Sequence, residues 1–374
     1  MNAELATLYS RLQKELVDPV LGINIGHKIK ERDLSLKKGM MSLIKGSTLH
    51  FKFEPGYFLG EDKQKVLIHI RQIAQECGFP EIEIEWSDTI RSHVVQGGLK
   101  PLKAVKNIVA VSSGKGGVGK STTSTNIALA LCQAGARVGI LDADVYGPSQ
   151  PLILNIEDAK IESVDESQGG GMKPQEAYGL AVNSIGFMLE TDAPAILRGP
   201  MVAQAVEQML NQTAWPQLDY LIIDMPPGTG DIALTLSQKA PLTGSVVVTT
   251  PQDVALLDAR KGLRMFQRVN VPILGVVENM SVHVCSHCGH AEHIFGEEGG
   301  KNMAQELEVP WLGALPLSRA VREQTDAGQP TVVSDPESEA AKRYHLIARR
   351  LAYNISELPI DRSGAFPKVV VENL

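Results

Sequence analysis

Cysteine and long apolar runs are both scarce in this sequence. Its 374 residues include four cysteines, and no uninterrupted apolar stretch comes near the roughly 20 residues that cross a bilayer. A disulfide framework is not expected where so few thiols accompany so much potential core. The opening segment, MNAELATLYSRLQKELVDP, scatters charges through an amphipathic helical pattern and does not resemble a secretion signal. We therefore expect a cytoplasmic protein with reduced thiols and no membrane attachment.

A surplus of basic residues is also absent. The chain has 36 Lys and Arg against 43 Asp and Glu, which gives a formal net charge of -7. A protein held mainly by charge on nucleic acid or on anionic lipid needs a basic surface. The charge balance therefore predicts that neither nucleic acid nor membrane is a partner.

The sequence divides into four parts. Residues 1–95 mix helical and strand patterns and predict a small α+β domain. Residues 96–106 hold Gly, Pro and Lys without periodicity and predict a linker. Residues 107–358 form the longest part, in which residues 157–176 predict a mobile polar loop, and residues 359–374 predict a loosely held tail. A chain of this length accommodates two domains of about 100 to 200 residues.

Within residues 107–358, buried strands alternate with amphipathic helices. Five short segments are rich in branched apolar residues: NIVAVSS, ARVGILDAD, DYLIIDMP, GSVVVTTP and PILGVVENM. Strands that are buried on both faces by crossover helices have this composition. The pattern predicts an α/β fold with a mostly parallel sheet flanked by helices. Ligands bind such sheets beyond the carboxyl ends of the strands.

A phosphate-binding motif follows the first of these strands. The segment fits G-x-x-x-x-G-K-[ST] and lies directly before a helical pattern, which is the context the motif requires. Its residues are Gly114, Lys115, Gly116, Gly117, Val118, Gly119, Lys120 and Ser121. The backbone NH groups of such a loop and the amino end of the helix cradle an anion. We expect Lys120 to reach the β and γ phosphates, Ser121 to hold Mg²⁺ and Thr122 to bond the α phosphate.

Carboxylates end two of the strands. Asp224 closes DYLIID, and Asp142 and Asp144 close RVGILDAD. Carboxylates gathered at one sheet edge repel one another, so a bound cation is the natural compensation. We expect Asp224 and Asp142 to hold Mg²⁺ with its water shell, and Asp144 to orient the attacking water. The alternative for Asp142 and Asp144 is a turn or a helix cap. In the following MPPGTGD, Gly228 is expected to offer its NH to the γ phosphate.

The loop carries a second lysine, Lys115, which cannot easily fold back onto its own nucleotide. A cation supplied by a facing subunit stabilises transition-state charge, an effect worth about 10³ to 10⁵ in rate for arginine fingers. Lys115 therefore predicts a homodimer that encloses its nucleotides, with both Lys115 and Lys120 contributing to catalysis.

A cysteine pair, Cys285 and Cys288, follows the last strand in the segment CSHC, with histidines nearby. Two thiols three positions apart supply half of a tetrahedral thiolate set, so two chains could share one iron–sulfur cluster. Zinc, held between subunits or with two nearby histidines, is an alternative because soft thiolates favour both metals. A redox dithiol and a metal-free turn also remain open. Cys77 and Cys132 are expected to be small core residues.

Four segments together carry a family resemblance. KGGVGKS, DADVYGPS, DMPPGTGD and ENMS resemble the deviant-loop ATPases, a class that includes MinD, ParA, the arsenite pump ATPase and nitrogenase iron protein. DADVYGPS with a CxxC after ENMS most closely resembles the Mrp/ApbC family of iron–sulfur cluster carriers. This resemblance spans residues 106–355. The N-terminal part, with LVDPVLGINI, resembles the small iron–sulfur assembly domain that is fused ahead of such ATPases.

The resemblance implies an ATPase that binds ATP and Mg²⁺ and carries a [4Fe-4S] cluster between two subunits. It also implies exchange with apo iron–sulfur proteins and cluster scaffold proteins, and an adenine contact for Asn279 in ENMS. One rival is a positioning ATPase like MinD or ParA, which needs a basic amphipathic carboxyl-terminal helix, whereas the tail AFPKVVVENL is short and near neutral. Another is a reductase resembling nitrogenase iron protein, which places its cluster cysteines singly and far apart.

Overall fold

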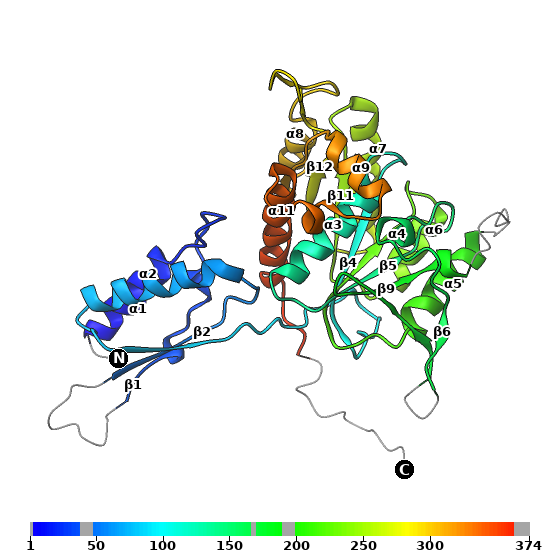
Figure 1. Cartoon of the computed structure of the whole chain (residues 1–374). Helices are drawn as coiled ribbons and strands as arrows, with labels where there is room; N and C mark the ends of the chain where they lie inside the picture. The colour runs from blue at the N-terminus through cyan, green and yellow to red at the C-terminus, as the bar shows by residue number, and fades with distance from the viewer. Residues whose placement is uncertain (1–2, 38–47, 166–169, 189–198, 363–374) are drawn as a thin grey trace, which may run out of the picture. The chain divides into compact units, whose positions relative to one another are not determined.

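The chain folds into two compact units, Met1–Ile90 and Arg91–Leu374. The computed structural model describes residues 3–37, 48–165, 170–188 and 199–362 of them. Each unit has its own sheet and its own helices (Figure 1).

The first unit is a three-stranded sheet with two helices. Its elements are α1 (Ala3–Glu15), β1 (Leu34–Lys37), β2 (Thr48–Phe53), α2 (Lys63–Glu76) and β3 (Ile82–Trp86). Strand β2 pairs antiparallel with β1 and parallel with β3. Its alternate residues Leu49, Phe51 and Phe53 are buried, as the two-residue period of a half-buried strand requires.

The second unit is built on a sheet that has eight strands within the described residues, in the order β15-β12-β11-β4-β10-β5-β9-β8. The strands are β4 (Val105–Ser113), β5 (Val138–Asp142), β8 (Gln175–Ala177), β9 (Leu180–Ser184), β10 (Leu218–Asp224), β11 (Gly244–Thr249), β12 (Ile273–Glu278) and β15 (Trp311–Ala314). All neighbours are parallel except β8 and β9. The predicted α/β fold with a mostly parallel sheet is confirmed.

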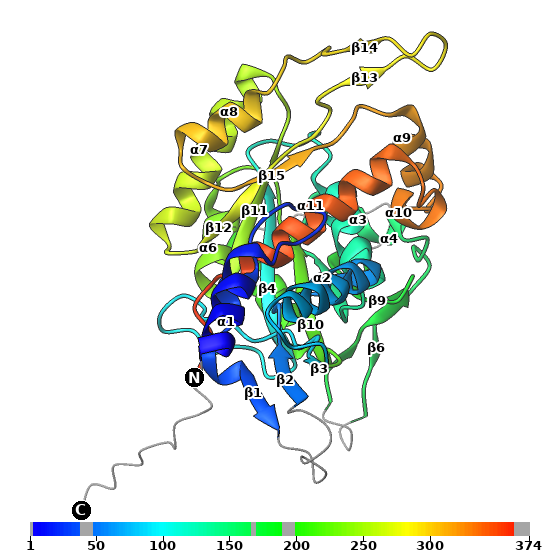
Figure 2. The same ribbon diagram turned by 90° about the vertical axis from the view of Figure 1, so that its left-hand side faces the viewer.

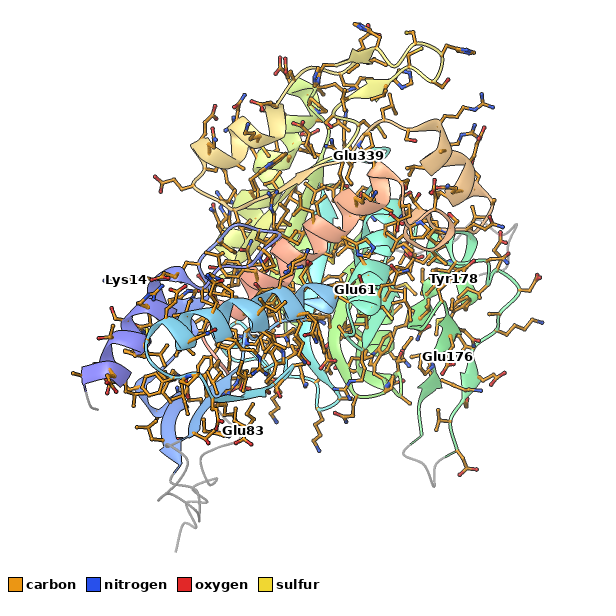
Figure 3. The ribbon with its side chains drawn as sticks, turned by 60° about the vertical axis from the view of Figure 1, so that its left-hand side comes forward. Lys14, Glu61, Glu83, Glu176, Tyr178 and Glu339 are labelled. Carbon is orange, nitrogen blue, oxygen red and sulfur yellow. The ribbon has the colours of Figure 1, made fainter. Side chains whose placement is uncertain are left out.

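Helices cover both faces of this sheet (Figures 1 and 2). One face carries α3 (Lys120–Gln133), α10 (Thr331–Ser334) and α11 (Glu339–Ser356), whose first residue is labelled in Figure 3. The other carries α5 (Gly199–Gln212), α6 (Asp231–Lys239), α7 (Asp253–Arg268) and α8 (Gly299–Glu306). The short α4 (Gln150–Ile153) contacts α3 and α9 (Arg319–Asp326). Helix α3 is buried on almost every side, including its polar residues 123–126, because it lies under α11 and on the centre of the sheet.

Two stretches that were expected to be irregular carry regular structure in part. Residues 157–176 include β6 (Glu162–Ser163), β7 (Met172–Lys173) and the start of β8. These strands are too short for a periodic pattern to reveal them. In the predicted tail, Pro359 O accepts from Val94 N at 2.9 Å, and residues 363–374 lie outside the described residues.

Candidate functional site

The predicted phosphate loop joins the end of β4 to the start of α3. Gly117 and Gly119 both have φ of +79°, a left-handed backbone conformation that favours glycine. A Cβ on Gly114 would lie 2.3 Å from the backbone carbonyl carbon of Asp258, because the loop packs against α7. A Cβ on Gly116 would meet nothing within 4 Å, so the loop is open on that side.

Lys120 is the buried cation of this site. Its side chain is 6% exposed, and Nζ lies 2.7 Å from Asp224 Oδ1 and 3.8 Å from Asp144 Oδ2. Ser121 Oγ lies 3.3 Å from the same nitrogen. The fold therefore brings the loop lysine and serine together with two strand-end carboxylates, whose charge the lysine offsets.

Asp224 is fully buried at the carboxyl end of β10. Its Oδ1 accepts from Lys120 and, at 3.0 Å, from Ser124 Oγ, while its Oδ2 accepts from Gln150 Nε2 at 3.0 Å. A buried carboxylate requires such donors. Ser124 and Gln150 were both missed from the sequence. Ser124 could have been found, since it lies one helical turn after Lys120 and shares its face, whereas no spacing rule identifies Gln150.

Asp142, at the end of β5, uses both carboxylate oxygens inside the chain. Oδ1 accepts from Asp144 N at 3.1 Å, and Oδ2 accepts from the NH groups of residues 149–150 and from Ser184 Oγ, each at 3.0 Å. Burial, and secondarily the charge of Asp224, raises the pKa of Asp142 to about 7. The side chain thus caps the loop that follows its own strand, which was the alternative considered from the sequence. A place for Asp142 among the Mg²⁺ ligands stays a prediction, and these bonds disfavour it.

Asp144 has a different environment from Asp142. Its Oδ1 is buried and has no hydrogen-bond partner among the residues that the structure describes. Burial raises the pKa of Asp144, and the Lys120 ammonium opposes that rise. A buried polar atom without a partner costs free energy until another group bonds it. Asp144 Oδ1 therefore lacks, within the described part of the chain, the donor that a buried carboxylate oxygen requires.

The loop after Asp224 lies across the end of β4. Gly228 has φ of +87°, and its NH donates to Ser113 O at 2.8 Å. The sequence predicted that this NH would face a γ phosphate. In this structure it is bonded within the chain instead, so that contact requires the Gly228–Ser113 hydrogen bond to open.

Lys115 contrasts with Lys120. Its side chain is half-buried but forms no ion pair or hydrogen bond within residues 3–37, 48–165, 170–188 and 199–362. Its backbone is fixed, because Ser113 Oγ donates to Lys115 O at 2.9 Å. Thr122, in the first turn of α3, also forms no side-chain hydrogen bond within those ranges. Both side chains are available to a ligand or to a second chain.

Asn279 connects the phosphate loop to the cysteine segment. It follows β12, and its Nδ2 donates to Val118 O at 2.9 Å; a Cβ on Gly119 would lie 2.1 Å from this nitrogen. Met280 has φ of +58°, which is uncommon for a residue other than glycine. Ser281 then bonds the carbonyl that follows β15 through both its NH and its hydroxyl. Adenine recognition by Asn279 stays a prediction, since its amide contacts the loop itself.

Cys285 and Cys288 lie in the turn between β13 (His283–Val284) and β14 (Ala291–Glu292). This hairpin projects beyond the end of the sheet (Figure 2). Cys285 is half-buried and Cys288 is exposed. Backbone NH groups of Cys288 and then of His287 donate to the Cys285 sulfur and lower its pKa. The turn therefore stabilises a thiolate before any metal binds.

The histidines near the pair do not complete a metal site in one chain. His283 Nδ1 lies 3.2 Å from Leu317 O, and His293 Nδ1 lies 2.8 Å from Ser281 O, so backbone carbonyls hold both rings. No group of three or more His, Cys, Asp or Glu side chains among the described residues could hold a metal ion. The zinc site with two nearby histidines, one alternative from the sequence, is not formed in this structure.

The other two cysteines lie away from this turn. Cys77 follows α2 in the first unit, and Cys132 lies near the end of α3 in the second. Both are half-buried, so the prediction that they are core residues is only partly correct. Burial raises the pKa of Cys132, which makes it a weak nucleophile.

The second unit matches a known protein family over most of its length. A family profile described as "ParA: NUBPL iron-transfer P-loop NTPase" matches residues 104–352. The chain belongs to this family. It is therefore a P-loop NTPase, and the resemblance drawn from KGGVGKS, DADVYGPS, DMPPGTGD and ENMS is confirmed.

Named relatives agree with this family. An iron–sulfur cluster carrier protein from Pseudomonas fragi is 54% identical over 271 residues, which cover 72% of this chain and 94% of that protein. The iron–sulfur cluster transfer protein NUBPL of Mus musculus is 47% identical over 274 residues, covering 72% and 85%. A solved nucleotide-binding protein from Archaeoglobus fulgidus, in complex with ADP, is 35% identical with a TM-score of 0.55, covering 63% of this chain and 90% of that one. Among the described residues, no helix is both long and apolar enough to cross a membrane.

Proposed function

We propose that the chain is an ATP-hydrolysing carrier that binds one [4Fe-4S] cluster between two copies of itself and delivers it to apo-proteins. One observation carries the proposal: an exposed turn offers two cysteines, one with a lowered pKa, and no third ligand among the described residues. Four thiolates hold a cluster of this type. Two such turns therefore make one complete set, and the names of the relatives support this cargo.

The residues of the phosphate site fit a magnesium-bound nucleotide. The glycine loop is open at Gly116, and a buried ammonium and a hydroxyl lie at its end. Lys120 would bind the phosphates, while Ser121 and Asp224 would hold Mg²⁺, which supplies charge neutralisation when bound. Lys120 is already paired with Asp224, so binding a phosphate exchanges one anionic partner of Lys120 for another. Preference for ATP over GTP rests on the family.

Two groups are suited to the hydrolytic step. Asp144 would orient the attacking water through Oδ1, the buried oxygen that has no partner among the described residues. Lys115, whose side chain is unpaired within the described part of the chain, would stabilise the developing charge in the site of a facing copy. Asp144 would act within its own chain, whereas Lys115 would make hydrolysis depend on a facing chain.

Exposed apolar side chains support a second copy as the partner. Tyr146 is 64% exposed after β5, and Val254 and Leu257 are 67% and 58% exposed at the start of α7, after β11. Parallel strands end at one edge of the sheet, so these side chains lie on the same edge as Lys115. A second copy facing this edge would cover them and bring the two cysteine turns to the same side.

Anaerobic reconstitution with iron and sulfide tests the proposal. We expect about four iron and four sulfide per two chains, with visible charge-transfer absorbance that transfers to an apo-protein. Cys285→Ser and Cys288→Ser should each abolish cluster binding, while Cys132→Ser, the matched control, should retain it. A cluster that survives Cys285→Ser, one cluster per chain, or zinc in place of iron in protein purified without oxygen would contradict the proposal.

A further inference from the structure

Gln150 joins three parts of the phosphate site through one carboxamide. The residue is fully buried. Its Nε2 lies 3.0 Å from Asp224 Oδ2 and 3.2 Å from Ser121 O, and its Oε1 lies 2.6 Å from Thr125 Oγ1. The same side chain thus contacts the end of β10 and two consecutive turns of α3.

The orientation of this amide follows from its neighbours. With the amide reversed, Oε1 would face Asp224 Oδ2 and Ser121 O, and two acceptors at hydrogen-bond distance repel each other. The NH₂ group has two donors, and these two acceptors use both of them. Gln150 is therefore fixed as a donor to the carboxylate of Asp224.

The backbone of Gln150 is anchored as firmly as its side chain. It is the first residue of α4, and its NH donates to Asp142 Oδ2 at 3.0 Å. The loop between β5 and α4 contains Asp144, the carboxylate with the unbonded oxygen. Gln150 consequently connects this loop to Asp224, so a displacement of either is transmitted to the other.

The connection matters because the Lys120 ammonium cannot bind Asp224 and a nucleotide phosphate equally closely. It now lies 2.7 Å from Asp224 Oδ1, and in the proposed function it moves to a phosphate. Asp224 then loses its cation and keeps Ser124 and Gln150 as donors. Hydrogen bonds to a charged acceptor are among the stronger ones in a buried site.

We propose that Gln150 is a positioning residue that holds Asp224 in place for Mg²⁺ once Lys120 has turned to the nucleotide. This inference rests on the proposed nucleotide hydrolase function. Gln150 needs no contact with the nucleotide itself. Of its contacts, the bond to Asp224 Oδ2 is the one that bears on the metal, so removing it should weaken the response to Mg²⁺ and leave metal-free nucleotide binding almost unchanged.

Binding of a fluorescent ADP analogue to the full chain, titrated with Mg²⁺ and repeated in EDTA, tests this inference. In Gln150→Met, which keeps the length and loses both donors, the Mg²⁺ concentration for half-maximal effect should rise by about tenfold or more, the size expected for a bond to a charged group. Affinity in EDTA should stay within about twofold, since the bond serves the metal-bound state. Gln305→Met, an exposed position on α8, is the control and should leave both values unchanged.

A second variant keeps the test decisive if Gln150→Met does not fold. Gln150→Asn remains polar but is one methylene shorter, and it should show the same selective loss. A folded variant of either kind with the wild-type Mg²⁺ response would overturn the role of Gln150. A wild-type protein whose nucleotide binding ignores Mg²⁺ would instead overturn the proposed function, so the two failures are distinguishable.

Discussion

The phosphate site and the cysteine turn differ in burial and in the number of groups that bond their charged side chains. Lys120 and Asp224 are buried and paired with each other, and Asp224 also accepts from Ser124 on α3 and from Gln150 on α4. Cys285 and Cys288 lie on a projecting hairpin, where the Cys285 sulfur is stabilised by backbone NH groups of the turn and by the Cys288 side chain. The difference indicates which chemistry one chain can organise alone. The buried charged groups of the phosphate site are bonded within one chain, whereas in the proposed function the cysteine turn is half of a site.

One short segment connects the two regions. Asn279 Nδ2 donates to Val118 O in the phosphate loop, and Cys285 follows six positions later. Between them, Ser281 and Val282 are bonded to the loop after β15. A change in the phosphate loop therefore has a short bonded route to the base of the hairpin.

Breaking the buried pair of Lys120 and Asp224 should have the largest effect. Lys120→Ala removes the group expected to bind the phosphates and leaves the buried Asp224 without its cation. We expect hydrolysis to fall to background and the free energy of unfolding to fall by about 3 kcal/mol, since removing one partner of a buried pair is costly. A phosphate-release assay and a denaturant titration measure the two effects. Hydrolysis that persists in Lys120→Ala would contradict the assignment of the site.

Changing the unpaired lysine should separate binding from hydrolysis. Lys115→Ala should lower turnover by about 10³, the lower range for a charge supplied by a facing chain. ATP binding and stability should be nearly unchanged, because the side chain has no partner among the described residues. Turnover and ATP affinity measured side by side check this. Unchanged turnover would remove the argument for a lysine acting across the dimer.

A smaller effect is expected at the carboxylate with the unbonded oxygen. Asp144→Asn keeps the shape but loses the charge that orients water, so hydrolysis should fall by about 10². Stability should not fall, because burial already disfavours the charged form and raises its pKa. Asp158→Asn, at an exposed position, is the matched control for both readouts. Equal turnover in the two variants would assign the water to another group.

The smallest effect concerns thiol reactivity in the metal-free protein. The pKa of Cys285 is lowered by backbone donors, and that of Cys132 is raised by burial. Because the thiolate is the reacting form, alkylation of Cys285 should reach half its maximal rate at a lower pH than alkylation of Cys132. Mass spectrometry of iodoacetamide-treated protein across pH measures both sites. The reverse order would show that the turn does not stabilise a thiolate.

The strands and the phosphate-binding motif could be predicted from the sequence, but the side-chain hydrogen bonds that join them could not. Local patterns of spacing alone predict the strand ends at Asp142 and Asp224 and the loop from Gly114 to Ser121. Gln150 was missed because its contact with Asp224 joins residues far apart in the chain. Asp142 was expected to bind Mg²⁺, since no local pattern tells a strand-end carboxylate that caps its own loop from one that faces a cation.

In the proposed function, two chains meet face to face and together complete the cysteine site. Light scattering on anaerobically reconstituted Asp144→Asn protein, with ATP and Mg²⁺ present and turnover suppressed, tests it most directly. We expect the mass of two chains with one cluster, and the mass of one chain when Cys285→Ser is combined with Lys115→Ala. A single chain that holds the metal with ATP bound would contradict it.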